Sequence, residues 1–171
     1  MNDEQYTIHH IEHISSRSFE EVITDFETLV GNVENGTFGK LSAAANNEED
    51  FNKRVREHEE KSGFMQFLLI DHGQWLPHVG INGKKARMYT IGNPLIAQTM
   101  LKYDIRVGLN VPVRLFIYEN SNDNTVRLAY DLPSSLMSRL KNEEVTTAAK
   151  KLDAKLGDLC ENVANAFKRQ N

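Results

Sequence analysis

A stripe of apolar residues near the C-terminus constrains the fold more than any other feature of the sequence. Its members recur every three or four positions, and Lys150, Lys151, Asp153 and Glu161 fall between them. This spacing predicts a long amphipathic helix with one apolar face. Such a helix must pack along a sheet or another helix. The stripe consists of Val145, Ala149, Leu152, Leu156, Leu159, Val163 and Phe167.

The preceding part of the chain contains strand-like segments that could form that sheet. Segments rich in β-branched, aromatic and alternating apolar residues occur at 5–14, 64–71, 85–91, 111–119 and 125–130. The first alternates imperfectly, because Ile8 and Ile11 have opposite parity, and a bulge near His9 and His10 would reconcile them. We interpret residues 75–81 as a loop or short strand that leads into the hairpin dipeptide Asn82-Gly83.

Helical signals occur both early and in the middle of the chain. Ser18 and Glu21 form a capping box ahead of an apolar periodicity that ends at Gly31. Residues 46–61 are charged and predict a solvated helical insert, whereas residues 32–47 give no clear pattern. Strands in series, joined by short turns and followed by a long helix, predict an α+β fold: an antiparallel sheet with helices packed on one face. The length favours a single domain over residues 1–171.

The segment Tyr89-Thr-Ile-Gly-Asn-Pro contains an abrupt change of pattern from strand to helix. Asn93 is a good N-cap, Pro94 suits a first helical position, and Gly92 lets the backbone turn or approach a neighbour closely. We expect a helix from Pro94 to about Tyr103. The segment is either a structural joint only or, because free N–H groups gather there, a place where a ligand docks.

A second joint resembles the first. Tyr130-Asp131-Leu132-Pro133 leaves a strand and enters a short helix, which Asp131 could cap. Two such strand ends could face one cleft between the sheet and the long helix, depending on a strand order that the sequence does not reveal. The expected ligand-binding residues are Tyr89, Gly92, Asn93, Pro94, Tyr130 and Asp131.

Composition narrows the classes of function. The chain has 171 residues with a net charge of −4, so nothing indicates the basic face of a nucleic-acid-binding protein. Its single cysteine excludes an intrachain disulfide, and no apolar run approaches the length of a membrane span. No signal peptide is visible at the N-terminus. We expect a soluble, cytoplasmic protein without nucleic-acid or membrane partners, although a removed leader would be invisible.

No strong catalytic or metal-binding signature occurs. Asp71 and His72 are weak candidates for an acid–base pair, because neighbours on a strand point to opposite faces. His9, His10 and His13 lack the further ligands that a zinc site needs, so surface histidines are the better interpretation. We expect no metal and no cofactor.

Several stretches resemble the bacterial and archaeal family called domain of unknown function 302. The blocks ARMYTIGNPLIAQTML, GLNVPVRLFIYEN and LAYDLPSSL carry the resemblance, and SSRSFEEVI and KKLDAKLGDL fit it. The resemblance implies a TATA-binding-protein-like fold with β-α-β4-α order, a curved antiparallel sheet and a long C-terminal helix. It also implies a homodimer, and no common activity. Asp131-Leu132 departs from the family's Asn-Asp, and the charged insert is longer than in short members.

Two functional hypotheses remain from the sequence, with a third that involves no ligand. The first is a noncatalytic small-ligand-binding or sensing domain that acts as a homodimer. The second is an enzyme of unknown reaction that uses a His/carboxylate pair. The third is a structural or assembly partner.

Overall fold

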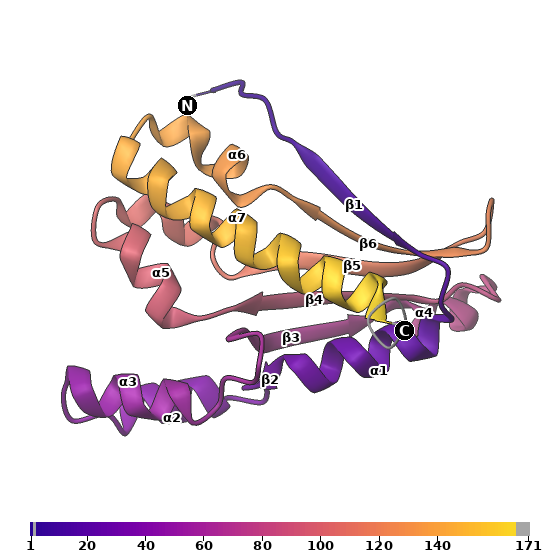
Figure 1. The fold of residues 1–171 in the computed structure, drawn as a ribbon, viewed down its shortest axis with the longest axis horizontal. Helices are drawn as coiled ribbons and strands as arrows, with labels where there is room; N and C mark the ends of the chain where they lie inside the picture. The colour runs from indigo at the N-terminus through magenta and orange to yellow at the C-terminus, as the bar shows by residue number, and fades with distance from the viewer. Residues whose placement is uncertain (2, 167–171) are drawn as a thin grey trace.

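The protein is built on one curved sheet with helices packed against one face, as the computed structural model in Figure 1 shows. The structure describes residue 1 and residues 3–166. The sheet has six strands in the order β1-β6-β5-β4-β3-β2. Neighbours pair antiparallel except β2, which lies parallel to β3. The strands are β1 (His10–Ser15), β2 (Gly31–Asn32), β3 (Met65–Asp71), β4 (Ala86–Gly92), β5 (Val113–Asn120) and β6 (Thr125–Asp131).

Ten helical segments connect and cover these strands in the described part of the chain. The long C-terminal helix α7 crosses in front of the sheet in Figure 1 and contacts β1, α1, α5 and α6. The α-helices are α1 (Phe19–Leu29), α2 (Thr37–Ala43), α3 (Glu48–Arg56), α4 (His72–Trp75), α5 (Pro94–Leu101), α6 (Pro133–Met137) and α7 (Glu143–Ala164). The 3-10 helices are η1 (Leu76–Val79), η2 (Ile105–Leu109) and η3 (Ser138–Leu140). The α+β class and the β-α-β4-α frame are confirmed, with β2 and short helices added.

The main core lies between the helices and the inner face of the sheet. The predicted stripe of α7 is buried from Val145 to Val163, and Leu156 is fully inaccessible. Phe167, the last predicted member, lies outside the described residues. Helix α1 contributes Val22 and Phe26, and its Ser18–Glu21 capping box is present. Burial of each large side chain contributes about 1.5 to 3 kcal/mol, so the stripe holds α7 on the sheet.

A second, smaller hydrophobic cluster lies on the β2–β3 side of the sheet. It consists of Val33, Leu41, Val55 and Met65, with Phe38 and Phe67 packed against it. The charged insert contains α3, which ends at Arg56 rather than at residue 61. Val55 anchors this helix, because its side chain is fully buried in the second cluster.

Three local predictions were wrong. Strand β1 starts at His10 and pairs with β6 in continuous register, without the predicted bulge. Ile8 and Ile14 lie exposed, so the imperfect alternation reflects an open outer face and not a slipped register. The segment after β3 forms α4 and η1, because the Asp71 carboxylate accepts a hydrogen bond from the Gln74 amide, and the predicted hairpin does not form.

The third correction concerns Asp131. It does not cap α6, whose N-cap residue is Leu132 without a side-chain hydrogen bond. The carboxylate of Asp153 on α7 accepts a hydrogen bond from the Ser134 amide instead, at 2.9 Å. The first turn of α6 is thereby tied to the long helix.

Candidate functional site: an apolar cavity at the Asn93-Pro94 corner

The joint between β4 and α5 forms as its sequence predicts. Strand β4 ends at Gly92, Asn93 is the N-cap, and α5 begins at Pro94. The Asn93 side-chain oxygen accepts a hydrogen bond from the Leu95 amide at 2.8 Å. Its amide nitrogen donates to the Glu59 carboxylate at 2.5 Å and to the Gly63 carbonyl at 2.8 Å. Asn93 is buried, and these bonds tie the corner to the segment before β3.

A cavity of about 230 Å³ lies beside this corner. Its walls come from α2, β3, the β4–α5 corner, α5, the start of β5 and α7. It therefore separates residues of the main core, such as Met100 and Leu152, from Phe38 and Phe67 of the smaller cluster. The lining residues are Phe38, Phe67, Ile91, Gly92, Asn93, Pro94, Ile96, Ala97, Met100, Leu101, Val111, Pro112, Val113 and Leu152.

Gly92 packs closely against Pro112 at the edge of this cavity. A Cβ atom at this position would lie 3.1 Å from Cβ of Pro112 and 3.6 Å from the Phe67 ring. The absence of a side chain lets the strand end lie directly against Pro112. Asn93 is the one polar side chain in the lining, and its amide and its oxygen are already bonded to protein groups. The cavity therefore suits an apolar group rather than an anion.

Tyr89, also expected at the site, lies elsewhere. It points from β4 into the main core, where it is fully buried and packs on Phe26 with ring centroids 4.6 Å apart. Its hydroxyl donates to the Glu27 carboxylate at 2.8 Å. Burial raises the pKa of Tyr89 far above its usual value. Tyr89 does not line the cavity at Asn93.

The two proline-containing corners lie at the same end of the sheet. Strands β4 and β6 both run antiparallel to β5, so their carboxyl ends are about 10 Å apart. Tyr130 and Asp131 point to opposite faces, however. Tyr130 is buried on the inner face, with its hydroxyl 3.4 Å from Nε2 of His13. Asp131 lies on the outer face and pairs with Nδ1 of His10 at 2.9 Å.

Asp71 and His72 are adjacent, but each contacts a different partner. The Asp71 carboxylate pairs with Nε of Arg87 at 2.8 Å and caps α4. Nδ1 of His72 accepts a hydrogen bond from Nε1 of Trp75 at 3.2 Å. Within the described residues, no hydrogen bond joins the two side chains, so the structure does not assemble them into an acid–base pair.

The histidines of the first strand are also dispersed. His10 lies on the outer face of β1, whereas His13 lies on the inner face, stacked with Tyr130 at a centroid distance of 6.0 Å. Burial lowers the pKa of His13, and the Glu161 carboxylate partly offsets this effect. Among the described residues, no group of three or more His, Cys, Asp and Glu side chains is placed to hold a metal ion.

Comparison with known proteins identifies the family. The family model described as "Domain of unknown function DUF302" matches residues 40–163. The chain belongs to this family. A crystal structure of an uncharacterised conserved DUF302 protein from Bacillus stearothermophilus superposes with a TM-score of 0.63 and 16% sequence identity, covering 91% of this chain and 98% of the other. At this identity the likeness concerns the fold alone. No curated protein matches the chain. No helix in the described part of this DUF302 protein is long and apolar enough to cross a membrane.

Sequence reasoning located the Gly92-Asn93-Pro94 corner of this DUF302 chain but missed most of the cavity wall. Phe38, Phe67, Val111 and Leu152 come from four separate segments. No local pattern connects such residues, because only the tertiary packing brings them together. Caps and turns are local and can be read directly, whereas a cavity is a property of the packed chain.

Proposed function

We propose that this DUF302 protein is a noncatalytic binding domain for a small, uncharged, apolar ligand. The observation that carries the proposal is the cavity of about 230 Å³ at the Asn93-Pro94 corner. This space is a half-open pocket with an almost wholly apolar lining, and such pockets are typical of small-molecule sites. An apolar cavity of about 150 Å³ in another protein binds benzene, so this volume suits a ring-sized or short branched molecule.

The chemistry of the walls supports an apolar ligand. Asn93 uses its side-chain groups on Leu95, Glu59 and Gly63, which leaves hydrogen bonding at the site satisfied without a ligand. A charged molecule would lose its hydration without gaining a partner there. Of the residues expected from the sequence, the proposal uses Gly92, Asn93 and Pro94.

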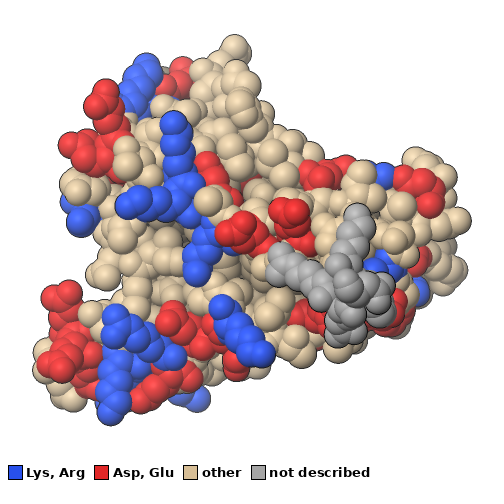
Figure 2. Space-filling model, in the orientation of Figure 1, with Lys and Arg blue, Asp and Glu red and all other residues tan. Residues whose placement is uncertain are grey.

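The cavity walls come from two parts of the molecule, so a ligand bound there would contact both. Figure 2 shows the surface hollowed between the part that carries α5 and the part that carries α2 and α3. Phe38 of α2 and Ile96 of α5 both line the cavity. A bound molecule would touch both parts and would fasten them together, which is the basis of a sensing role.

Thermal unfolding in the presence of benzene tests the binding proposal. Benzene should raise the melting temperature of the wild-type protein, because a ligand that binds only the folded state stabilises it. Ala97→Phe, which fills the cavity, should abolish the rise. Ala154→Phe adds the same ring on the exposed side of α7 and should leave it intact. Equal benzene responses of the two variants, or no response of the wild type, would refute the proposal.

We also propose that the protein forms a homodimer through the β3 side of the open sheet face. The evidence for this interface is a set of three large apolar side chains that are exposed to solvent. Leu68, Ile70 and Trp75 are 46%, 37% and 46% exposed. Exposed apolar side chains that gather on one surface are typical of interaction sites. Sedimentation velocity should show a dimer that Leu68→Lys converts to monomer, while the exposed Thr99→Lys has no effect. A monomeric wild type would contradict this part.

A further inference from the structure

The outer face of the sheet carries a second hollow, of about 350 Å³. It extends across β1, β6, β5 and β4. No residue is shared between the two linings. Its own lining consists of His10, Glu12, Met88, Arg114, Phe116, Tyr118, Ala129, Tyr130 and Asp131.

The middle of this hollow is formed by apolar and aromatic side chains. Phe116 pairs with Ala129 on one side and with Met88 on the other, so a small residue and a thioether flank its ring. The ring of Tyr118 stacks beside that of Phe116, with centroids 5.1 Å apart and an interplanar angle of 23°. Aromatic side chains present a large apolar surface and pack well beside other rings, so this part of the hollow suits an apolar partner that contains a ring.

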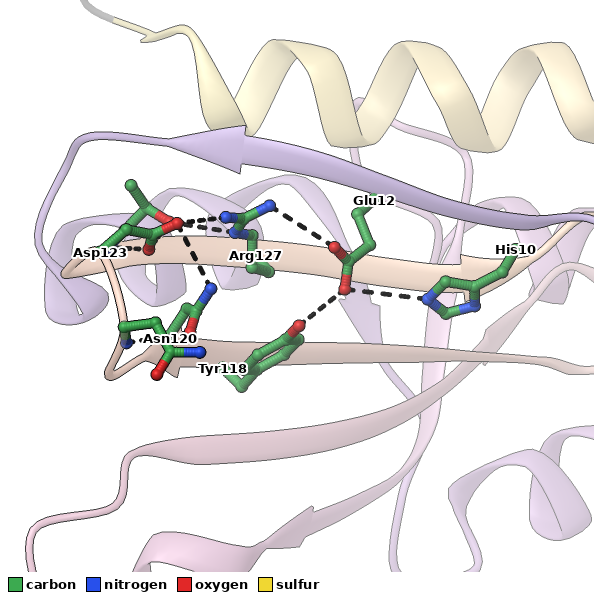
Figure 3. Close-up of polar contacts among 8 residues, drawn as sticks. His10, Glu12, Tyr118, Asn120, Asp123 and Arg127 are labelled. Atoms are coloured by element: carbon green, nitrogen blue, oxygen red, sulfur yellow. Dashed lines mark hydrogen bonds and ion pairs between the residues drawn. The ribbon is translucent and has the colours of Figure 1, made fainter.

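The acidic groups around the hollow already have partners, as Figure 3 shows for Glu12. The Glu12 carboxylate accepts a hydrogen bond from the Tyr118 hydroxyl at 2.6 Å and lies 3.5 Å from the Arg127 guanidinium. Arg127 is in turn bonded to Asp123. Asp131 pairs with His10. Each of these carboxylates therefore already has a hydrogen-bonding partner in the protein.

Arg114 differs from these charged neighbours. It is exposed on β5 opposite Thr90, and within the described residues no hydrogen bond or ion pair engages its guanidinium. The hollow thus combines an apolar middle with one guanidinium group that has no partner among the described residues. Guanidinium groups bind carboxylates through two parallel hydrogen bonds.

We propose that this outer hollow is a second binding site, for a small monocarboxylate that carries a flat apolar body. The carboxylate pairs with Arg114, and the flat body lies on Phe116 and beside Met88. One negative charge is matched by one free cation, whereas a more highly charged anion would be repelled by Glu12 and Asp131. The proposal is independent of the apolar cavity and of its ligand.

Titration with 1-naphthoate, followed by backbone-amide NMR, tests this site. Saturable shifts should appear at Arg114, Phe116 and Ala129. Arg114→Gln, an exposed substitution that should leave the fold intact, should weaken binding by about fivefold or more, because it removes a charge-assisted pair. Arg56→Gln removes the same charge from the exposed side of α3 and should have no effect. The uncharged 1-naphthalenemethanol should bind as weakly to the wild type as naphthoate binds to Arg114→Gln.

Three results would overturn the proposal. The first is equal naphthoate affinity of the wild type and Arg114→Gln. The second is a set of shifts at Ala97 and Met100, which would place the probe in the apolar cavity and would leave the proposed function standing. The third is occupation of the hollow by a second copy of the chain, seen as a concentration-dependent dimer in which Arg114 amide shifts move without any probe and naphthoate does not bind.

Discussion

A methyl group at Gly31 would collide with the backbone of a distant segment. A Cβ atom built at this residue lies 1.8 Å from the carbonyl oxygen of His58. Gly31→Ala should therefore lower the free energy of unfolding by about 3 kcal/mol, since the backbone must shift. Gly39→Ala is the matched control, because open space surrounds that position on α2. It should raise the stability by up to about 1 kcal/mol. Urea unfolding of both variants measures these free energies. A loss of less than about 1 kcal/mol in Gly31→Ala would contradict the close approach of Gly31 to the His58 backbone.

Substitution of Asn93 should also lower the free energy of unfolding by more than the loss of a single N-cap. Asn93→Ala removes the cap of α5 and leaves the partly buried Gly63 carbonyl and Glu59 carboxylate without this donor. The expected loss is about 2 kcal/mol, the sum of a cap and of hydrogen bonds to two partly buried acceptors. Asn142→Ala, at the N-cap of α7, removes only a cap and should cost about 1 kcal/mol. Equal losses in chemical denaturation would show that the bonds to Glu59 and Gly63 contribute nothing.

At the scale of elements, the attachment of α7 decides whether the inner face of the sheet is covered. Leu156→Asp places a charge at a fully buried position of the stripe and should unfold the protein or cost about 4 kcal/mol or more. Lys150→Asp on the exposed side of the same helix should change stability by less than about 1 kcal/mol. Circular dichroism during thermal unfolding measures both. A folded Leu156→Asp protein of normal stability would mean that α7 does not rest on the sheet.

The elements that sequence reasoning predicted well are those with local signals. The Ser18–Glu21 box and the Asn93-Pro94 joint are set by nearest neighbours, and both form. The helix predicted from the apolar periodicity is confirmed as α7, because one face of that helix is buried along its length. Errors occurred where tertiary context decides. Ile14 breaks the alternation of β1 because its side chain lies exposed on the outer face of the sheet, and Asp71 caps a helix where a loop or strand was expected.

The candidate site was predictable only in part for the same reason. Adjacent residues on a strand point to opposite faces, so the side chains of Tyr130 and Asp131 could not both point into the expected cleft between the sheet and the long helix. Tyr89 has the alternation of a core residue and lies in the core. The corner at Asn93 could be predicted from local sequence. The wall residues Phe38 and Leu152 could be predicted only from the strand order and the packing of α2 and α7.

At the scale of the whole molecule, stability should depend on the titration of His13. Burial lowers the pKa of His13 in the folded state below the ordinary value of 6.5, so the unfolded chain binds a proton first as the pH falls. The free energy of unfolding is therefore unaffected by His13 above that value and decreases as the pH falls from about 6.5 toward the lowered pKa. His13→Gln should flatten this part of the pH profile, whereas exposed His78→Gln should not. An unchanged slope in His13→Gln would refute the assignment.

The whole-molecule account depends on the cavity between the main core and the α2–α3 part being a ligand site. Solvent extraction of the purified protein, followed by mass spectrometry of the extract, tests this most directly. The account predicts a small apolar molecule that copurifies with the wild type and with Ala154→Phe but is absent from Ala97→Phe. Identical extracts from Ala97→Phe and the wild type would contradict it.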